Sequence, residues 1–538
     1  MRGRGAAGAG AAYTRPVLLG LLWACAPLEG GANESAEADT ADAAPDTGAA
    51  PATCEPYTVT TLAEWSELDL PSREPLDHTV QGVAVGDLDG DGDLDALVAW
   101  AGGSFGLRND GAGGLSVDPA IRATNGDLPG SEAVALADLD GDGDLDAMLG
   151  SWSTEASVYW NDGTGVFTPE VLPGTDVVTY AIAFGDADGD GDLDAYVSAA
   201  AYNMTYEEIV SGAQVGDGNL LLIQDDDHHF AERVGALPED TRYGMTLHSV
   251  WFDADADGDL DLYVGNDAGP YVDGNHLLIN DGHGDFTRAA DCGCELVNYT
   301  MGVGVGDANQ DGLLDLYVTD VGPPTLLWNL GDGTFVNATL NAGDAYVPSS
   351  ETSMVSWAAG FADLDADRDQ DLVVTFGQSG KNFSAAGVQA TDGPVQPNQV
   401  LLSDGAGRFD KAEPGFADGP RTRTYALGDF DRDGRPDLLT AGKYFVRVAL
   451  SGGGCPPGAT LRLHGASLVG AKIEAEVAGE TQTLWHLPST TSSSSADEVY
   501  LGFGGYPSAD RVRITWPGGA TSELEDVAAG TVVDVDAP

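Results

Sequence analysis

Basic residues are scarce in this chain of 538 residues, where 23 Lys and Arg stand against 87 Asp and Glu and leave a formal net charge of −64. So acidic a surface argues against nucleic acid and against an anionic membrane as binding partners. Beyond the N-terminal segment, no apolar stretch approaches the roughly 18 residues of a membrane span. We therefore expect contact with a membrane only through an N-terminal lipid anchor.

Common catalytic motifs are also missing. The sequence has no H-E-x-x-H and no Gly-rich phosphate-binding loop. Of its 8 His residues, His228 and His229 lie in a predicted hairpin turn beside Asp225, Asp226 and Asp227, which indicates a solvated surface more than a metal site. We therefore expect a protein that is not an enzyme.

Signals for helices are sparse as well. Gly is abundant, at 74 residues, and short apolar runs alternate with turns of Gly, Asn and Asp. This pattern predicts an all-β chain.

What the sequence does contain is an acidic loop that recurs seven times. The first copy reads DLDGDGDLD, and the shared pattern is D-x-[DN]-x-D-x-x-x-D. Intervals of roughly 50 to 65 residues between copies are typical of repeat architectures. The seven copies, named loop 1 to loop 7, begin at Asp87, Asp138, Asp186, Asp253, Asp307, Asp363 and Asp429.

The spacing within each loop suits a calcium ion. Side-chain oxygens at positions 1, 3, 5 and 9 and the backbone carbonyl at position 7 form an oxygen-rich site, whereas magnesium resists so crowded a protein cage. Zinc would require Cys or His, which the loops lack. We expect about seven calcium ions, one in each loop. The predicted metal-binding residues are Asp87, Asp89, Asp91, Asp93 and Asp95; Asp138, Asp140, Asp142, Asp144 and Asp146; Asp186, Asp188, Asp190, Asp192 and Asp194; Asp253, Asp255, Asp257, Asp259 and Asp261; Asp307, Asn309, Asp311, Leu313 and Asp315; Asp363, Asp365, Asp367, Asp369 and Asp371; and Asp429, Asp431, Asp433, Arg435 and Asp437.

Position 12 excludes the EF-hand, which requires Glu there. That position holds Val98, Leu149, Val197, Val264, Val318, Val374 and Thr440. A short strand begins at position 9 or 10 instead, so each loop is predicted to join two strands. Asn309 at position 3 of loop 5 still offers an oxygen, but Arg368 replaces the usual Gly at position 6 of loop 6, which makes loop 6 the weakest candidate. For any one loop, the alternative is an acidic turn without an ion.

Four strands can be traced in each repeat between residues 54 and 455. A strand enters the acidic loop, a second leaves it, and a Gly-rich hairpin such as residues 160–167 leads from the third to a fourth. Four antiparallel strands form a propeller blade. The chain here resembles the FG-GAP or VCBS-type repeats of integrin α-like propellers. The resemblance implies a seven-bladed β-propeller with its calcium loops on one face.

The ends of this region predict how the propeller closes. The seventh repeat lacks a fourth strand, and residues 57–62 resemble an orphan one, so we expect the N-terminal strand to complete the last blade. Cys54 and Cys455 flank these two strands and are predicted to form a disulfide. Cys292 and Cys294 are open to three states: bridged, reduced or metal-bound.

Residues 1–25 have the three parts of a secretory signal and end in a sequence that resembles a bacterial lipobox at Cys25. The alternative is an ordinary signal peptide with an incidental Cys. Residues 26–53 have almost no large apolar side chains and are predicted to be a disordered acidic linker. We expect an exported protein, either a lipoprotein of the cell surface or outer membrane or a secreted one.

Residues 459–538 contain alternating apolar positions, such as those in residues 511–516, and are predicted to form a small β domain. The segments 470–473, 501–504 and 512–519 resemble the ASPIC/UnbV domain, which commonly follows such propellers in bacterial proteins and in cartilage acidic protein. The Ser-rich stretch at 489–495 is expected to be a surface loop.

Two predicted insertions, Ser198 to Asn219 and Gly377 to Gln399, should emerge on the face opposite the calcium loops. Long loops on a rigid scaffold commonly bind ligands, although tolerated surface insertions explain them equally well. The function predicted is therefore a calcium-stabilised, non-catalytic extracellular propeller that binds a protein or polysaccharide at the cell surface. The alternatives are an extracellular enzyme or enzyme accessory, with its site in the central channel or the C-terminal domain, and a structural role in an envelope assembly.

Overall fold

The computed structural model describes residues 51–61, 80–200, 218–345, 355–377, 397–412, 422–442, 445–465, 467–490 and 492–538. The predicted signal with Cys25, nearly all of the predicted linker and most of both predicted insertions therefore lie outside the described residues. Residues 49–538 form one compact unit.

The described residues are almost entirely β-structure. They form nine sheets, and their helical content is limited to two 3-10 turns, η1 (Thr339–Asn341) and η3 (Pro517–Gly519). The all-β prediction is confirmed.

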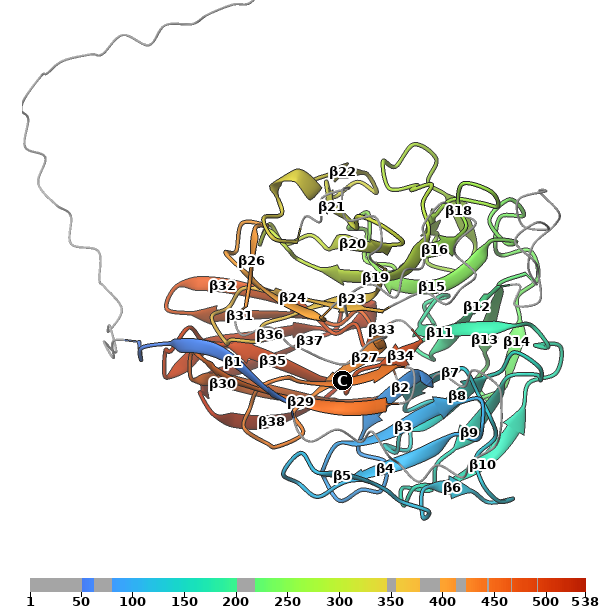
Figure 1. Ribbon diagram of the computed structural model, residues 1–538, viewed down its shortest axis with the longest axis horizontal. Coiled ribbons are helices and arrows are strands. Elements are labelled where there is room, and N and C mark those ends of the chain that lie inside the picture. The colour runs from blue at the N-terminus through green and yellow to red at the C-terminus, as the bar shows by residue number, and fades with distance from the viewer. Residues whose placement is uncertain are drawn as a thin grey trace, which may run out of the picture. The chain divides into compact units, whose positions relative to one another are not determined.

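Seven of the nine sheets in the described chain come from the repeats and are named sheet 1 to sheet 7 (Figure 1). In each, an acidic loop joins the first strand to the second, and neighbouring strands are antiparallel. The strands are, in sheet 1, β2 (Val80–Gly86), β3 (Asp95–Trp100), β4 (Phe105–Asn109) and β5 (Leu115–Val117); in sheet 2, β7 (Ala133–Ala137), β8 (Asp146–Gly150), β9 (Ser157–Trp160) and β10 (Val166–Val171), with β6 (Arg122–Ala123) parallel to β10; in sheet 3, β11 (Thr179–Gly185), β12 (Asp194–Ala199), β13 (Leu220–Gln224) and β14 (Phe230–Glu232); in sheet 4, β15 (Met245–Phe252), β16 (Asp261–Asp267), β17 (His276–Asn280) and β18 (Phe286–Arg288); in sheet 5, β19 (Thr300–Gly306), β20 (Asp315–Asp320), β21 (Thr325–Asn329) and β22 (Phe335–Asn337); in sheet 6, β23 (Ser356–Ala362), β24 (Asp371–Phe376), β25 (Gln399–Ser403) and β26 (Phe409–Lys411); and in sheet 7, β27 (Thr422–Gly428), β28 (Asp437–Gly442), β29 (Phe445–Gly454) and β1 (Glu55–Thr61).

The first two strands of each sheet are the most buried, because they consist mainly of Ala, Val, Leu and Gly, which allow close packing on both faces. All five residues of β7 are buried, whereas β10 at the outer edge is largely exposed. The apolar core lies between neighbouring sheets, as where Leu97 of sheet 1 and Val134 of sheet 2 share one cluster.

The first strands of successive sheets lie side by side. β2 contacts β7, and the contacts continue through β11, β15, β19 and β23 to β27, which in turn contacts β2. β1 pairs with β29, so that Val59 lies opposite Ser451, and Cys54 is bonded to Cys455. Both the predicted N-terminal strand and the predicted disulfide are therefore present in the structure.

The C-terminal residues form two further sheets that share one apolar core, which includes Leu461, Ile473 and Ile514. One sheet has the order β35-β30-β38, and the other has the order β32-β31-β36-β37. The strands are β30 (Pro457–His464), β31 (Lys472–Val477), β32 (Glu480–Trp485), β35 (Glu498–Gly502), β36 (Ser508–Thr515), β37 (Thr521–Ala528) and β38 (Thr531–Asp536).

The Ser-rich stretch is not a surface loop, and that prediction was wrong. Its short strands β33 (Ser489–Thr490) and β34 (Ser493–Ser494) join sheet 1, where Ser494 pairs with Ala84. The hydroxyls of Ser493, Ser494 and Ser495 accept backbone N–H groups from β2, β7 and β27 at 2.9, 3.2 and 3.0 Å. Because each hydroxyl has a backbone partner, this polar segment is buried among the first strands.

Candidate metal centres

Three carboxylates converge in the acidic loops. In loops 1, 2, 3 and 4, oxygens from positions 1, 3 and 9 lie within 4.8 Å of one another. Oxygens this close can contact one divalent cation. The residues brought together are Asp87, Asp89 and Asp95; Asp138, Asp140 and Asp146; Asp186, Asp188 and Asp194; and Asp253, Asp255 and Asp261.

Hydrogen bonds within each loop fix its curvature. In loop 4, Asp253 Oδ2 accepts the N–H of Gly258 at 3.1 Å, and Asp257 Oδ1 accepts the N–H of Asp259 at 3.1 Å. The position 6 residue therefore bonds to position 1, and the position 7 residue bonds to position 5. Gly258 has φ 101°, which explains why Gly suits position 6.

The carboxylate at position 9 has an additional structural role. Asp261 Oδ2 accepts the N–H of Ala254 and Asp261 Oδ1 accepts the N–H of Asn280, both at 2.9 Å, so it ties the acidic loop to the third strand of its sheet. Burial is the main cause that raises the pKa of the Asp at position 9, and two other carboxylates of the same loop, from positions 1, 3 or 5, add to it. The pKa rises to about 7 for Asp95 and Asp194, about 8 for Asp146, Asp261 and Asp315, and about 9 for Asp437.

Several loop oxygens are buried without any hydrogen-bond donor among the described residues. They include Asp95 Oδ2, Asp138 Oδ1, Asp188 Oδ1, Asp255 Oδ1, Asp365 Oδ1 and Asp431 Oδ1. A buried carboxylate oxygen without a partner is costly, and a divalent cation would satisfy it. The residues present therefore fit calcium.

A ladder of amides links neighbouring repeats, and sequence reasoning missed it. At the end of the third strand of sheet 2, Asn161 Nδ2 donates to the Leu88 carbonyl in loop 1 at 3.0 Å. Asn109 donates in the same way to Phe430 in loop 7, at 2.9 Å. The remaining members are Gln224 to Leu139, Asn280 to Ala187 and Asn329 to Ala254. The Asn or Gln that precedes each Gly-rich or acidic hairpin, as at Asn161, was the available signal.

His228 and His229 lie in the sheet 3 hairpin. His229 is exposed, and His228 Nδ1 lies 3.2 Å from Gln224 Nε2. Asp226 of the same hairpin joins Asp190 and Asp192 in an exposed acidic group. Nothing else in the described surroundings indicates a metal site there.

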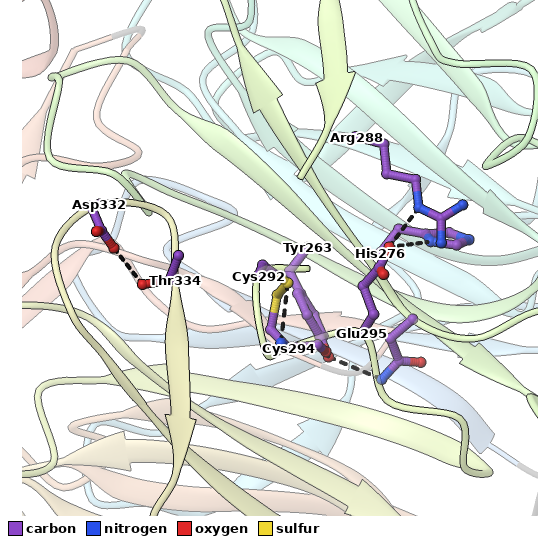
Figure 2. Close-up of a disulfide and its surroundings, with 9 residues drawn as sticks. Tyr263, His276, Arg288, Cys292, Cys294, Glu295, Asp332 and Thr334 are labelled. Carbon is purple, nitrogen blue, oxygen red and sulfur yellow. Dashed lines mark hydrogen bonds and ion pairs between the residues drawn. A yellow bond between two sulfur atoms is a disulfide. The ribbon is translucent and has the colours of Figure 1, made fainter. Parts of the chain in front are cut away.

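Cys292 and Cys294 form a disulfide, which settles a state the sequence left open (Figure 2). Tyr263 donates to the Cys294 carbonyl at 2.8 Å, while the Cys292 carbonyl accepts the N–H of Phe335 in sheet 5 at 2.7 Å. The bridge therefore lies in a segment that connects sheets 4 and 5.

Residues 138–197, 253–318 and 307–374 match the family model described as FG-GAP-like repeat, and residues 464–538 match the one described as ASPIC and UnbV. The chain contains FG-GAP-like repeats and an ASPIC/UnbV domain. The resemblance drawn from the acidic loops and from the C-terminal motifs is thereby confirmed.

Solved structures with similarity to this chain include a lectin, a sialidase and a biofilm matrix protein. A lectin of Agrocybe aegerita, described as recognising non-reducing terminal N-acetylglucosamine, has 18% identity and a TM-score of 0.42, covering 70% of this chain and 85% of its own. Trypanosoma rangeli sialidase has 9% identity and a TM-score of 0.36, covering 73% and 59%. The V. cholerae biofilm matrix protein Bap1 has 14% identity and a TM-score of 0.33, covering 90% and 85%. Scores this low carry no conclusion about ligand or activity.

Comparison with curated proteins found no match. Among the described residues, no helix has the length and apolar character needed to cross a membrane.

The ASPIC/UnbV domain closes a cavity against the FG-GAP repeats. The cavity has a volume of about 110 Å³, and Trp251, Phe361 and Tyr425 line it from the repeats. His486 and Tyr500 line it from the ASPIC/UnbV domain. Small-molecule sites usually exceed about 300 Å³, so this space is small for a substrate.

Loop 6 departs from the pattern for a visible reason. Arg368 adopts φ 90°, and its guanidinium pairs with Glu480 of the ASPIC/UnbV domain at 2.8 Å. In loop 5, Asn309 Nδ2 donates to Asp311 Oδ2 at 3.0 Å, and Asn309 Oδ1 accepts the backbone N–H of Asp311 at 3.1 Å.

Proposed function

We propose that this protein is a calcium-stabilised, non-catalytic binding protein exposed at the cell surface, and that its seven repeat sheets close into a seven-bladed β-propeller. Two contacts support closure: β27 lies beside β2, and β1 completes sheet 7. Neither end of the row of sheets is then left without a neighbour, as a ring requires.

The observation that carries the calcium proposal is the set of buried loop oxygens without donors. Positions 1, 3, 5 and 9 and the position 7 carbonyl would hold the ion. The bound ion supplies positive charge that offsets crowded carboxylates and fixes the loop backbone. At free calcium of ten to a hundred times the dissociation constant, each site would contribute about 1 to 3 kcal/mol to stability.

Calcium content of the full chain tests this proposal directly. The purified protein is chelated, reloaded and dialysed, its bound calcium is counted by atomic emission, and melting is followed in each state. We expect about six or seven ions per chain and a large drop in melting temperature in chelator. Two or fewer ions, or melting that chelator does not change, would reject the proposal.

The cavity of about 110 Å³ under the ASPIC/UnbV domain is smaller than the roughly 300 Å³ of a usual small-molecule site. The partner proposed is a protein or a polysaccharide. Calcium-loaded protein is applied to a polysaccharide panel, and each polysaccharide that binds is then analysed for cleavage products. Binding without products supports the proposal, whereas released oligosaccharides favour the enzyme alternative.

Export and anchoring are proposed from the sequence of residues 1–25. In a bacterial host fed with labelled fatty acid, the full chain should acquire label and pellet with membranes. Cys25→Ser should abolish the label, and label that persists in this variant would exclude Cys25 as the lipidation site.

A further inference from the structure

Loop 6 is covered by the ASPIC/UnbV domain. Gln482 on β32 donates its Nε2 to Asp363 Oδ2 at 3.2 Å and to the Arg368 carbonyl at 3.3 Å. The Gly502 backbone lies so close that a Cβ there would come within 1.9 Å of Asp363 Oδ2. Asp363 is consequently only 3% exposed.

Further contacts hold the same loop from outside the repeat. Gly504 donates its N–H to the Ala366 carbonyl at 3.0 Å, and Cys455 donates to the Asp365 carbonyl at 2.7 Å. The guanidinium of Arg368 points outward to Glu480 rather than to a loop carboxylate, at 2.8 Å. The cover is therefore built from several segments and adds no Lys or Arg, so the loop's own Arg368, which acts on Asp367 and Asp369, is its nearest positive charge among the described residues.

This arrangement buries carboxylates without a charged partner. Asp363 and Asp371 are 3% and 1% exposed, and no Lys or Arg among the described residues forms an ion pair with either. Two buried oxygens in the same place, Asp365 Oδ1 and Gln482 Oε1, have no hydrogen-bond donor. Gln482 is itself only 6% exposed, so its amide oxygen is an independent sign that a cation belongs there.

We propose that loop 6 is an interdomain cation site, in which a divalent cation holds the ASPIC/UnbV domain against the repeats and Gln482 connects the two through Asp363. The proposal rests on the calcium function proposed above and deepens it. Covering Asp363 is costly while the loop lacks a cation, so domain docking and cation affinity must strengthen each other. Gln482 acts as a positioning residue.

Loop 4 offers a matched comparison, because its carboxylates form no hydrogen bond or ion pair with the ASPIC/UnbV domain among the described residues. Asp255 occupies position 3 of loop 4 and Asp365 occupies position 3 of loop 6, and both have a buried, unpartnered Oδ1. A variant at either position should remove one ion. Only the loop 6 variant should release the domain.

The experiment compares full-length Asp365→Asn and Asp255→Asn in calcium and in chelator. Bound calcium is counted, and amide hydrogen exchange is measured over residues 480–502. We expect each variant to lose one ion and Asp365→Asn alone to exchange about tenfold faster in this segment. Equal exchange in both variants after loss of one ion each would overturn the interdomain site. If neither variant, nor the wild type in chelator, changes its calcium content, the calcium function itself fails.

Variants at Gln482 test the connecting residue. We expect Gln482→Leu to lower the affinity of one calcium ion about tenfold and leave the others unchanged. Gln482→Glu keeps an oxygen at this position, so in calcium its ASPIC/UnbV domain should dock as in the wild type. In chelator the domain of Gln482→Glu should undock more than that of Gln482→Leu, because the Glu adds negative charge. Thr481→Val, on the exposed face of β32, should change neither property. If both Gln482 variants bind calcium and exchange like Thr481→Val, Gln482 has no part in the site.

Discussion

Loops 1 and 4 have the same acidic motif but balance its charge differently. In loop 1, Arg108 pairs with Asp89, and Arg432 from sheet 7 pairs with Asp93. In loop 4, no carboxylate pairs with an Arg or Lys among the described residues, although both loops keep a buried oxygen without a donor, Asp95 Oδ2 in loop 1 and Asp255 Oδ1 in loop 4. Spacing therefore determines where oxygens converge, while residues distant in the sequence determine how much a loop depends on a cation.

The largest expected effect is that of pH on the chelated protein. The pKa of Asp261 is raised to about 8 and that of Asp95 to about 7. An Asp whose pKa is higher in the folded state than its unfolded value of about 4 stabilises the fold at pH values below that unfolded pKa. This contribution to stability is lost as pH rises through the folded pKa. We expect the free energy of unfolding in chelator to fall by several kcal/mol in total over all loops between pH 5 and pH 9, and the melting temperature to fall with it. Calorimetry in calcium should show little of this fall.

Substitution of the position 9 anchors should rank next. Asp261→Ala leaves two backbone N–H groups without a partner, at a cost of about 2 to 4 kcal/mol, whereas Asp95→Ala leaves one, at a cost of about 1 to 3 kcal/mol. Because this role does not involve the arginines, both losses should persist in chelator. Urea denaturation measures them, and a loss in loop 4 alone would show that position 9 acts only through the ion.

Substitutions at position 3 should have different effects on the stability of loops 1 and 4. In calcium, Asp255→Asn should cost about 1 to 3 kcal/mol and one bound ion, whereas Asp89→Asn should cost less because Arg108 already balances Asp89. Calcium counting and denaturation of both variants provide the test. Equal losses would mean that the arginine does not compete with the ion.

The smallest effect is expected for Arg108→Met. Removing a partly exposed guanidinium should cost at most about 1 kcal/mol in chelator. It should also raise the calcium affinity of loop 1 several-fold, which titration with a fluorescent competitor would detect. Unchanged affinity would remove the contrast between the two loops.

Much of this architecture could be predicted from local pattern. The loop spacing located the converging carboxylates of loops 1 to 4, and the orphan strand at 57–62 located β1 and its disulfide. These features follow from periodicity and chain order, which a single sequence displays.

Long-range polar contacts could not be predicted. Arg432 and Asp93 are far apart in the sequence and meet because sheets 7 and 1 are neighbours. Loop 6 was judged weakest because Arg368 replaces Gly, and the pairing of that side chain with Glu480 was invisible. The Ser-rich stretch was predicted to be exposed because composition does not reveal that buried backbone N–H groups of the first strands require hydrogen-bond acceptors.

The buried serines limit which fragments of this chain can be expressed separately. Ser493, Ser494 and Ser495 satisfy backbone N–H groups of three different repeat sheets. A fragment that stops after Cys455 would leave those donors unsatisfied on apolar strands and should be insoluble when expressed alone. We therefore expect the repeats and the C-terminal domain to fold as one unit, although they match two different family models.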